Sequence, residues 1–120
     1  AARYPGIRWI FSHGGGTMPF LLSRFTREEA SMKEREQRLP KGVMYELKKF
    51  NYDTAQANHS GALAALLKMV SPSQVLFGSD FPFRPGAEVI AGLAAYRFKA
   101  RDLRAIERDN ALKLMPSLRT

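Results

Sequence analysis

A short apolar run that ends in a single carboxylate constrains the fold of this chain most strongly. Residues 74–77 (Gln-Val-Leu-Phe) follow a Ser-Pro-Ser turn and predict a buried β-strand. Gly78 and Ser79 lead the backbone out of this strand to Asp80, and Pro82 prevents further ladder pairing. Parallel α/β folds place their chemistry at the carboxyl ends of strands. Asp80 is therefore a candidate metal ligand or proton acceptor, and the alternative is an Asp that caps the next turn.

A second segment repeats this layout near the start of the chain. Residues 7–11 (Ile-Arg-Trp-Ile-Phe) predict another strand, which leads through Ser12 to His13 and to three glycines at residues 14–16. Glycines let the backbone pass close to a ligand and adopt positive φ. His13 is expected to leave its strand at the same edge of a parallel sheet as Asp80, although 67 positions (80 minus 13) separate them. A structural His in a flexible turn is the alternative for His13 alone.

Three motifs and the last helical segment resemble the amidohydrolase-related family, which includes the aminocarboxymuconate-semialdehyde decarboxylase-like enzymes. The motifs are residues 10–16 (IFSHGGG), 50–55 (FNYDTA) and 75–82 (VLFGSDFP), and residues 106–114 (IERDNALKL) are similar to the last helix of the family. They occur in the family's order and together span nearly the whole chain.

The resemblance implies a (β/α)8 barrel that holds a divalent metal, usually zinc, at the carboxyl face of its strands. Members of the family bind this metal through a His-x-His pair on the first strand, a His on the fifth and an Asp on the eighth. A His on the sixth strand acts as the acid–base residue. By motif, Asp80 takes the metal-ligand role and His13 the acid–base role, so both are candidate catalytic residues. Residues 50–54 then correspond to the seventh strand.

The same comparison shows what a complete enzyme of this family would need in addition. The chain contains two histidines, His13 and His59, and no His-x-His pair, so three of the expected metal ligands are missing. A complete barrel takes about 250 residues, and this chain has 120. We therefore expect residues 1–120 to form one segment, the C-terminal part of the barrel, with about strands 6–8 and their helices. The alternative is a non-catalytic fragment or assembly module with an incomplete metal site.

The motifs are retained in two branches of the family, so the resemblance implies either a metal-dependent hydrolase or a non-oxidative decarboxylase. In the first branch a metal-activated water attacks an amide, ester or lactone carbonyl. In the second, this metal-activated water instead helps to protonate or hydrate the unsaturated carbon beside the leaving carboxyl group. In both branches His13 takes or returns a proton. The expected substrate is a small molecule that carries a carboxylate. Arg84 is a candidate for binding it, because a guanidinium matches a carboxylate with two hydrogen bonds, and an exposed loop Arg is the alternative. Asp53 is a candidate orienting acceptor, and a turn-forming Asp is the alternative.

Charge and composition narrow the range of partners. The net charge is +8, with Arg and Lys concentrated in residues 24–49 and 97–119. Acidic residues alternate with basic ones at helical spacing in the first of these segments, so we expect an outer, salt-bridged helix face and no nucleic-acid partner. The absence of Cys excludes disulfides and suits the cytoplasm. No apolar run approaches the roughly 20 residues that a transmembrane helix needs, so no membrane partner is expected either. Unpaired outer strands would favour homo-oligomers.

The remaining segments alternate strands with helices, which predicts an α/β fold. Residues 50–54 predict a third strand. An amphipathic segment from Pro19 to about Leu39 predicts one long helix. The other predicted helices cover residues 43–49, 61–70, 87–98 and 103–108, and Asn110 is expected to begin the last one. We expect His59 to be a surface residue near the start of the helix at 61–70, and the alternative is that it overhangs the site.

Overall fold

A three-stranded parallel sheet lies at the centre of the molecule. The computed structural model describes residues 2–119. Its strands are β1 (Ile10–Phe11), β2 (Asn51–Asp53) and β3 (Val75–Leu76), in the order β1-β2-β3. Ile10 is paired with Asn51 in the first ladder, and Tyr52 with Val75 in the second. The predicted α/β class and the three strands are confirmed, although β1 is shorter than the predicted run of residues 7–11.

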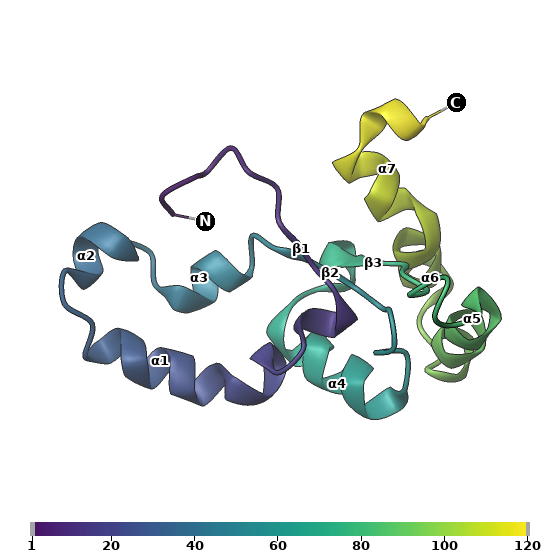
Figure 1. Ribbon diagram of the computed structural model, residues 1–120, viewed down its shortest axis with the longest axis horizontal. Coiled ribbons are helices and arrows are strands. Elements are labelled where there is room, and N and C mark those ends of the chain that lie inside the picture. The colour runs from purple at the N-terminus through teal and green to yellow at the C-terminus, as the bar shows by residue number, and fades with distance from the viewer. Residues whose placement is uncertain (1, 120) are drawn as a thin grey trace.

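Helices and tight turns connect and cover these strands. The helices are α1 (Leu22–Ala30), α2 (Arg35–Arg38), α3 (Val43–Leu47), α4 (Ser60–Met69), α5 (Gly86–Ala95), α6 (Ala100–Arg104) and α7 (Asn110–Leu114), with a π-helical turn at Ala105–Asp109. Figure 1 shows α1, α2 and α3 extending to one side of the sheet, α4 beside the strands, and α5, α6 and α7 gathered on the other side.

The core forms where the strands meet the helices that follow them. Tyr52 and Val75 of the sheet, Leu63 of α4, Leu93 of α5 and Ile106 of the π-helical turn are all fully buried. Burying one large apolar side chain contributes about 1.5–3 kcal/mol. This shared core therefore fixes β2 and β3 against α4 and α5, and with them the residues at the ends of the strands.

Asn110 ties the last helix to the beginning of β3. Its side chain is buried, and Nδ2 donates hydrogen bonds to the carbonyl oxygens of Pro72 and Val75, both at 2.8 Å. At the other end of β3, the backbone N–H of Phe77 donates to the carbonyl oxygen of Ile106 at 2.9 Å. A buried amide left without partners would cost about 1–3 kcal/mol. The Asn110 contacts therefore help to hold the strand from which the chain leads to the predicted site.

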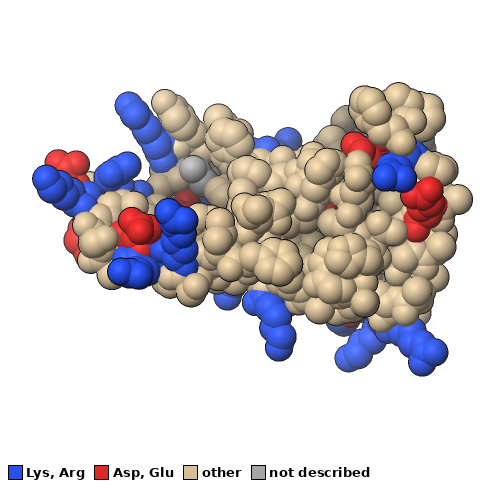
Figure 2. Space-filling view, turned by 60° about the horizontal axis from the view of Figure 1, so that its bottom comes forward, with Lys and Arg blue, Asp and Glu red and all other residues tan. Residues whose placement is uncertain are grey.

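The predicted long helix from Pro19 to Leu39 is wrong in its second half. A 3-10 turn at Met18–Leu21 runs into α1, which ends at Ala30, and the chain then reverses before α2. Glu34, at the reversal, has a positive φ of 56°. Side chains of both signs gather at this end of the molecule (Figure 2). The ion pairs here join Arg35 to Glu29 across the reversal and to its neighbour Glu36, so the expected ion pairing at helical spacing along one helix face is wrong for this segment.

Contacts of Glu29 explain the reversal. Its carboxylate accepts hydrogen bonds from the backbone N–H of Val43 at 2.9 Å and from Arg35 at 3.0 Å (Nε) and 2.9 Å (Nη2). One side chain thereby joins the end of α1 to the beginnings of α2 and α3. Helical periodicity does not reveal these contacts, because Val43 is 14 positions further along the chain.

The Glu29 contacts predict a pH-dependent contribution to stability. Hydrogen bonds from Val43 and Arg35 lower the pKa of the Glu29 carboxyl below its usual value of 4.5. A group with a lowered folded-state pKa stabilises the fold fully above its unfolded pKa and loses this effect as the pH falls through its folded pKa. Between about pH 6 and pH 3 we therefore expect the thermal midpoint to fall further in the wild type than in Glu29→Gln.

Circular dichroism of the protein at each pH measures these thermal midpoints. Glu28→Gln is the matched control, because Glu28 is the exposed neighbour of Glu29. It should keep the pH dependence of the wild type. A Glu29→Gln protein whose midpoint falls in parallel with the wild type would contradict the role of this carboxylate.

Both outer strands have an open edge within residues 2–119. Neither β1 nor β3 has a second partner strand in this part of the chain. Ile7, Trp9 and Ile10 are 50%, 37% and 46% exposed. The radius of gyration, 15.4 Å, exceeds the roughly 13.6 Å of a compact domain of this length. The described residues thus form an open sheet with one apolar edge uncovered. None of their helices combines the length and the apolar composition that crossing a membrane requires.

Candidate functional site

The carboxyl ends of all three strands meet at one edge of the sheet and carry the predicted polar residues. His13 follows β1, Asp53 is the last residue of β2, and Asp80 follows β3. Because the strands are parallel neighbours, their ends point the same way. The structure therefore brings His13, Asp53 and Asp80 to a single edge, as the sequence predicts.

Asp53 connects the end of β2 with the end of β1 and touches the end of β3. Its Oδ1 accepts hydrogen bonds from the backbone N–H groups of His13 at 2.9 Å and Ala55 at 3.0 Å. A Cβ placed on Gly78 would lie 2.9 Å from the Asp53 side chain, so the backbone after β3 passes directly against it. Asp53 thus acts as an acceptor for the backbone of the His13 turn. Its orienting role during a reaction stays a prediction.

Thr54 locks the ends of β2 and β3 together. It is fully buried, and its Oγ1 accepts from the backbone N–H of Gly78 at 3.1 Å and donates to the Gly78 carbonyl oxygen at 3.3 Å. Its own N–H donates to the carbonyl oxygen of Leu76 at 3.0 Å. Sequence reasoning assigned Thr54 no function. The sequence does offer one clue to this role. Thr54 carries a hydroxyl at the end of a buried strand, and a buried hydroxyl needs a hydrogen-bond partner.

The His13 turn has an ordered but uncommon backbone conformation. Four successive residues have positive φ: His13 at 55°, Gly14 at 62°, Gly15 at 80° and Gly16 at 60°. Two hydrogen bonds of 2.9 Å close the turn, from Gly15 N–H to the Ser12 carbonyl oxygen and from Gly16 N–H to the His13 carbonyl oxygen. The His13 side chain is exposed. The glycines therefore shape a defined turn that presents His13 at the strand edge.

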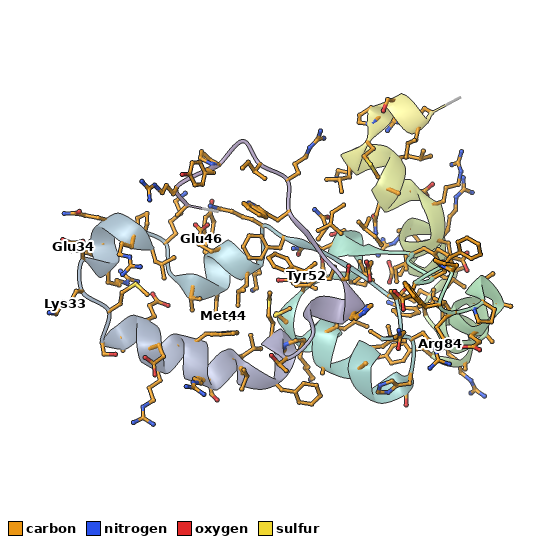
Figure 3. All side chains as sticks on the ribbon, in the orientation of Figure 1. Lys33, Glu34, Met44, Glu46, Tyr52 and Arg84 are labelled. Carbon is orange, nitrogen blue, oxygen red and sulfur yellow. The ribbon has the colours of Figure 1, made fainter. Side chains whose placement is uncertain are left out.

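Gly15 is the glycine of this turn that tolerates a side chain least. A Cβ there would lie 2.8 Å from the ring of Tyr52. The ring is fully buried and its hydroxyl donates to the Leu47 carbonyl oxygen at 3.0 Å, so it has little freedom to move aside. Burial raises the pKa of Tyr52 to about 12, so this hydroxyl stays protonated as a donor well above neutral pH. Figure 3 shows Tyr52 in the middle of the molecule, among the elements that it holds together.

We expect Gly15→Ala to lower the free energy of unfolding by about 2–4 kcal/mol, from the strained φ and the overlap with Tyr52 combined. Gly16→Ala is the matched control. Its φ is also positive, but its Cβ would meet nothing within 4 Å, so a loss of only about 1–2 kcal/mol is expected. Urea denaturation of the protein measures both values. Equal losses in the two variants would show that the overlap with Tyr52 has no effect.

Asp80 is fixed by its backbone turn and by a contact to its side chain. It has a φ of 64°, and its carbonyl oxygen accepts from the N–H groups of Phe83 at 2.9 Å and Arg84 at 3.3 Å. Its Oδ2 accepts a hydrogen bond from Nε2 of Gln56, a residue that sequence reasoning missed. Within residues 2–119 no hydrogen bond reaches Oδ1 of Asp80. One carboxylate oxygen is therefore held and the other is free.

A small open cleft of about 240 Å³ lies next to this turn. Its lining comes from the loop after β2, the loop after β3 and the beginning of α5: Gln56, Asn58, Ser79, Arg84, Glu88 and Val89. Asn58 Nδ2 donates to the Glu88 carbonyl oxygen at 2.9 Å, which ties the first loop to α5. Arg84 is exposed and lies on the α5 side of the molecule (Figure 3). The cleft gives Arg84 room to meet an anionic group.

His59 does not take part in this arrangement. It is exposed, and its Nδ1 accepts a hydrogen bond from the N–H of Ala62 at 3.3 Å, which caps α4. The expected surface position near a helix start is confirmed.

The described residues fit part of a divalent-metal site. Asp80 offers an anionic oxygen, which is a common metal ligand, and the imidazole of His13 is exposed at the same edge. Across residues 2–119, however, no three His, Cys, Asp or Glu side chains are grouped closely enough to hold an ion. A zinc site takes about three protein ligands. A metal at this edge would need further ligands from outside the described residues.

Known proteins resemble this chain along nearly its whole length. The amidohydrolase family profile matches residues 1–116. The 6-methylsalicylic acid decarboxylase of Penicillium expansum is 33% identical over 119 residues, and the 6-methylsalicylic acid decarboxylase acuB of Aspergillus aculeatus is 30% identical over 128 residues. These alignments cover 97% and 98% of this chain but only 37% and 38% of the two relatives. The chain thus spans little more than a third of their length.

Solved structures with a similar fold also match nearly all of this chain but only about a third of their own chains. The 2,6-dihydroxybenzoate decarboxylase from Rhizobium superposes with a TM-score of 0.80 at 21% identity, over 96% of this chain and 36% of that one. A 5-carboxyvanillate decarboxylase from Novosphingobium aromaticivorans, in complex with manganese, gives a TM-score of 0.78 at 20% identity, over 92% and 33%. These neighbours have the TIM-barrel fold, so the open three-stranded sheet matches part of a barrel.

Proposed function

Because the chain belongs to the amidohydrolase family, we propose that it is part of a metal-dependent, non-oxidative decarboxylase of small aromatic carboxylic acids. The observation that carries the proposal is the meeting of His13 and Asp80 at the carboxyl edge of one parallel sheet. Both sequence relatives named above are decarboxylases, and their names specify 6-methylsalicylic acid as the substrate. We propose an aromatic acid of this kind as the substrate class.

We further propose that residues 1–120 form the C-terminal part of the barrel, with β1, β2 and β3 as about the sixth, seventh and eighth strands. The order of the three motifs supports this placement, and so does the open edge on either side of the sheet. The missing metal ligands would then come from the earlier strands of the complete protein. This arrangement explains why the described residues provide a carboxylate and an imidazole without a complete ion site.

His13 and Asp80 are assigned complementary roles in this proposal. In the reaction, the bond between the ring carbon and the carboxyl carbon breaks, carbon dioxide leaves, and the electron pair stays on the ring carbon. His13 donates the proton that this carbon takes up. Asp80 would hold the metal, and it is thereby part of the catalytic machinery. A divalent metal bound there would supply positive charge that stabilises negative charge developing on the substrate.

Arg84 is proposed to bind an anionic group of the substrate, and Asp53 to orient the turn that carries His13. Support for Arg84 comes from its exposed position on a cleft beside Asp80. Support for Asp53 comes from its hydrogen bond to the His13 N–H.

For the metal, zinc remains our expectation from the family resemblance, and manganese is the ion bound in the solved decarboxylase from Novosphingobium aromaticivorans. We also expect the enzyme to act in the cytoplasm, and its open strand edges would favour association if they stay uncovered.

The direct test is an assay of carbon dioxide release by the complete protein that carries this chain. The protein is first treated with a chelator and then supplied with Mn²⁺ or Zn²⁺. The substrates are 6-methylsalicylate and 2,6-dihydroxybenzoate, and benzoate is the control without a ring hydroxyl. Metal-dependent release from the hydroxylated acids would support the proposal. If an aryl amide or a lactone, supplied in a parallel assay, is hydrolysed while no carbon dioxide is released from the acids, the hydrolase branch is indicated instead. No turnover together with no bound metal would favour the non-catalytic alternative.

A further inference from the structure

The loop that follows β2 presents Gln56 in a fixed orientation. Gln56 has a φ of 51°, in the left-handed region that few residues other than Gly adopt. Its two neighbours, Ala55 and Ala57, are 4% and 6% exposed, so the loop is anchored in the core on both sides of it. The N–H of Ala57 also donates to the carbonyl oxygen of Thr54 at 3.0 Å. The exposed Gln56 side chain is therefore directed by a rigid backbone.

From this loop Gln56 reaches across to the end of β3. Its Nε2 donates to Oδ2 of Asp80, 24 positions further along the chain. Each of the two residues lies on a loop with its own internal hydrogen bonds, so the contact joins two fixed backbones. An amide is uncharged, and it restrains the carboxylate without neutralising it. A Lys or Arg at this position would bind the carboxylate as well, but would repel a cation brought to its other oxygen.

Because of this contact, the two carboxylate oxygens of Asp80 differ in their hydrogen bonding. Oδ2 is occupied by Gln56, while Oδ1 is free of hydrogen bonds from the described residues and keeps the orientation that the Gln56 contact imposes. Partners that orient a ligating carboxylate in this way affect metal affinity by about 10–100-fold when they are removed.

We infer that Gln56 is a positioning residue that orients the Asp80 carboxylate for a divalent metal. This inference rests on the proposed function, since it concerns the metal that Asp80 is proposed to bind. It goes beyond that proposal by assigning a role to a loop residue that acts through Asp80.

The test compares Gln56→Met and Gln56→Ala with the wild type in the complete protein that carries this chain. Met keeps the length of the side chain and loses the donor, so it separates the hydrogen bond from the bulk. The probe is Mn²⁺ alone, titrated into metal-free protein while the free ion is followed by electron paramagnetic resonance. Both variants are expected to raise the dissociation constant for Mn²⁺ by about 10–100-fold, with an unchanged thermal midpoint of the metal-free protein. Gln37→Ala, an exposed Gln on α2, is the matched control and should bind Mn²⁺ as the wild type does.

Kinetics distinguish positioning from a general structural defect. With saturating Mn²⁺, kcat of Gln56→Met should return to within about threefold of the wild type, since only metal binding is weakened. A merely structural role would reduce the active fraction and leave the Mn²⁺ dissociation constant unchanged. Suppose that the wild type binds Mn²⁺ and decarboxylates, while the dissociation constant of Gln56→Met for Mn²⁺ stays within about threefold of the wild-type value. In that case this inference is wrong and the proposed function stands. If the wild type neither binds Mn²⁺ nor decarboxylates, both are wrong.

Discussion

Replacing Asp80 by Ala should remove both metal binding and decarboxylation from the complete protein that carries this chain. Asp80 is the carboxylate at the strand edge whose Oδ1 is free, whereas Asp53 already uses Oδ1 for two backbone N–H groups. We expect activity to fall by about 10³-fold or more, because the charge that holds the ion next to the substrate is lost. The bound metal is measured by elemental mass spectrometry on protein purified without chelators.

Two further variants make the Asp80 result interpretable. Asp80→Asn keeps the size of the side chain and an oxygen that accepts from Gln56, so a loss of metal in this variant identifies the charge as the cause. Asp109→Ala removes a half-exposed carboxylate of the π-helical turn, which pairs with Arg104 and Arg108, and should leave metal content and activity unchanged. Full metal occupancy in Asp80→Ala would show that Asp80 is not a ligand.

Replacing His13 should stop turnover while the metal stays bound. The proposed proton donor is lost, and general acid catalysis contributes about 10²–10⁴-fold to rate. We therefore expect kcat to fall by about that factor in His13→Ala, with KM and metal content within about threefold of the wild type. His13→Asn is the better conformational match, because Asn tolerates the positive φ of this position, 55°. Steady-state kinetics at saturating Mn²⁺ measure both variants.

His59→Asn is the control for removing a histidine. His59 caps α4 away from the strand ends, and Asn is a good residue at this position of a helix, so activity should not change. Loss of the metal together with activity in both His13 variants would make His13 a ligand. A kcat close to that of the wild type would mean that another group delivers the proton.

The secondary-structure predictions are correct where the local sequence pattern determines which element forms. The apolar runs before His13 and before Asp80 became β1 and β3, and Asn110 begins the last helix as expected. Local pattern failed between Pro19 and Leu39, where helical periodicity continues through the sequence but the chain turns back. The reason is the carboxylate of Glu29, which is satisfied by Val43 and Arg35 rather than by a neighbour on its own helix.

The sequence alone determined which residues could carry chemistry and on which kind of element they would stand. His13 and Asp80 follow short apolar strands, and in a parallel sheet such residues come to one edge. The tertiary structure decided how these residues are held. The backbone N–H of His13 donates a hydrogen bond to the side chain of Asp53, 40 positions away. The side chain of Asp80 accepts one from the side chain of Gln56, 24 positions away. Such contacts form only after the strands have packed side by side, because no local preference of the backbone relates residues so far apart in the chain.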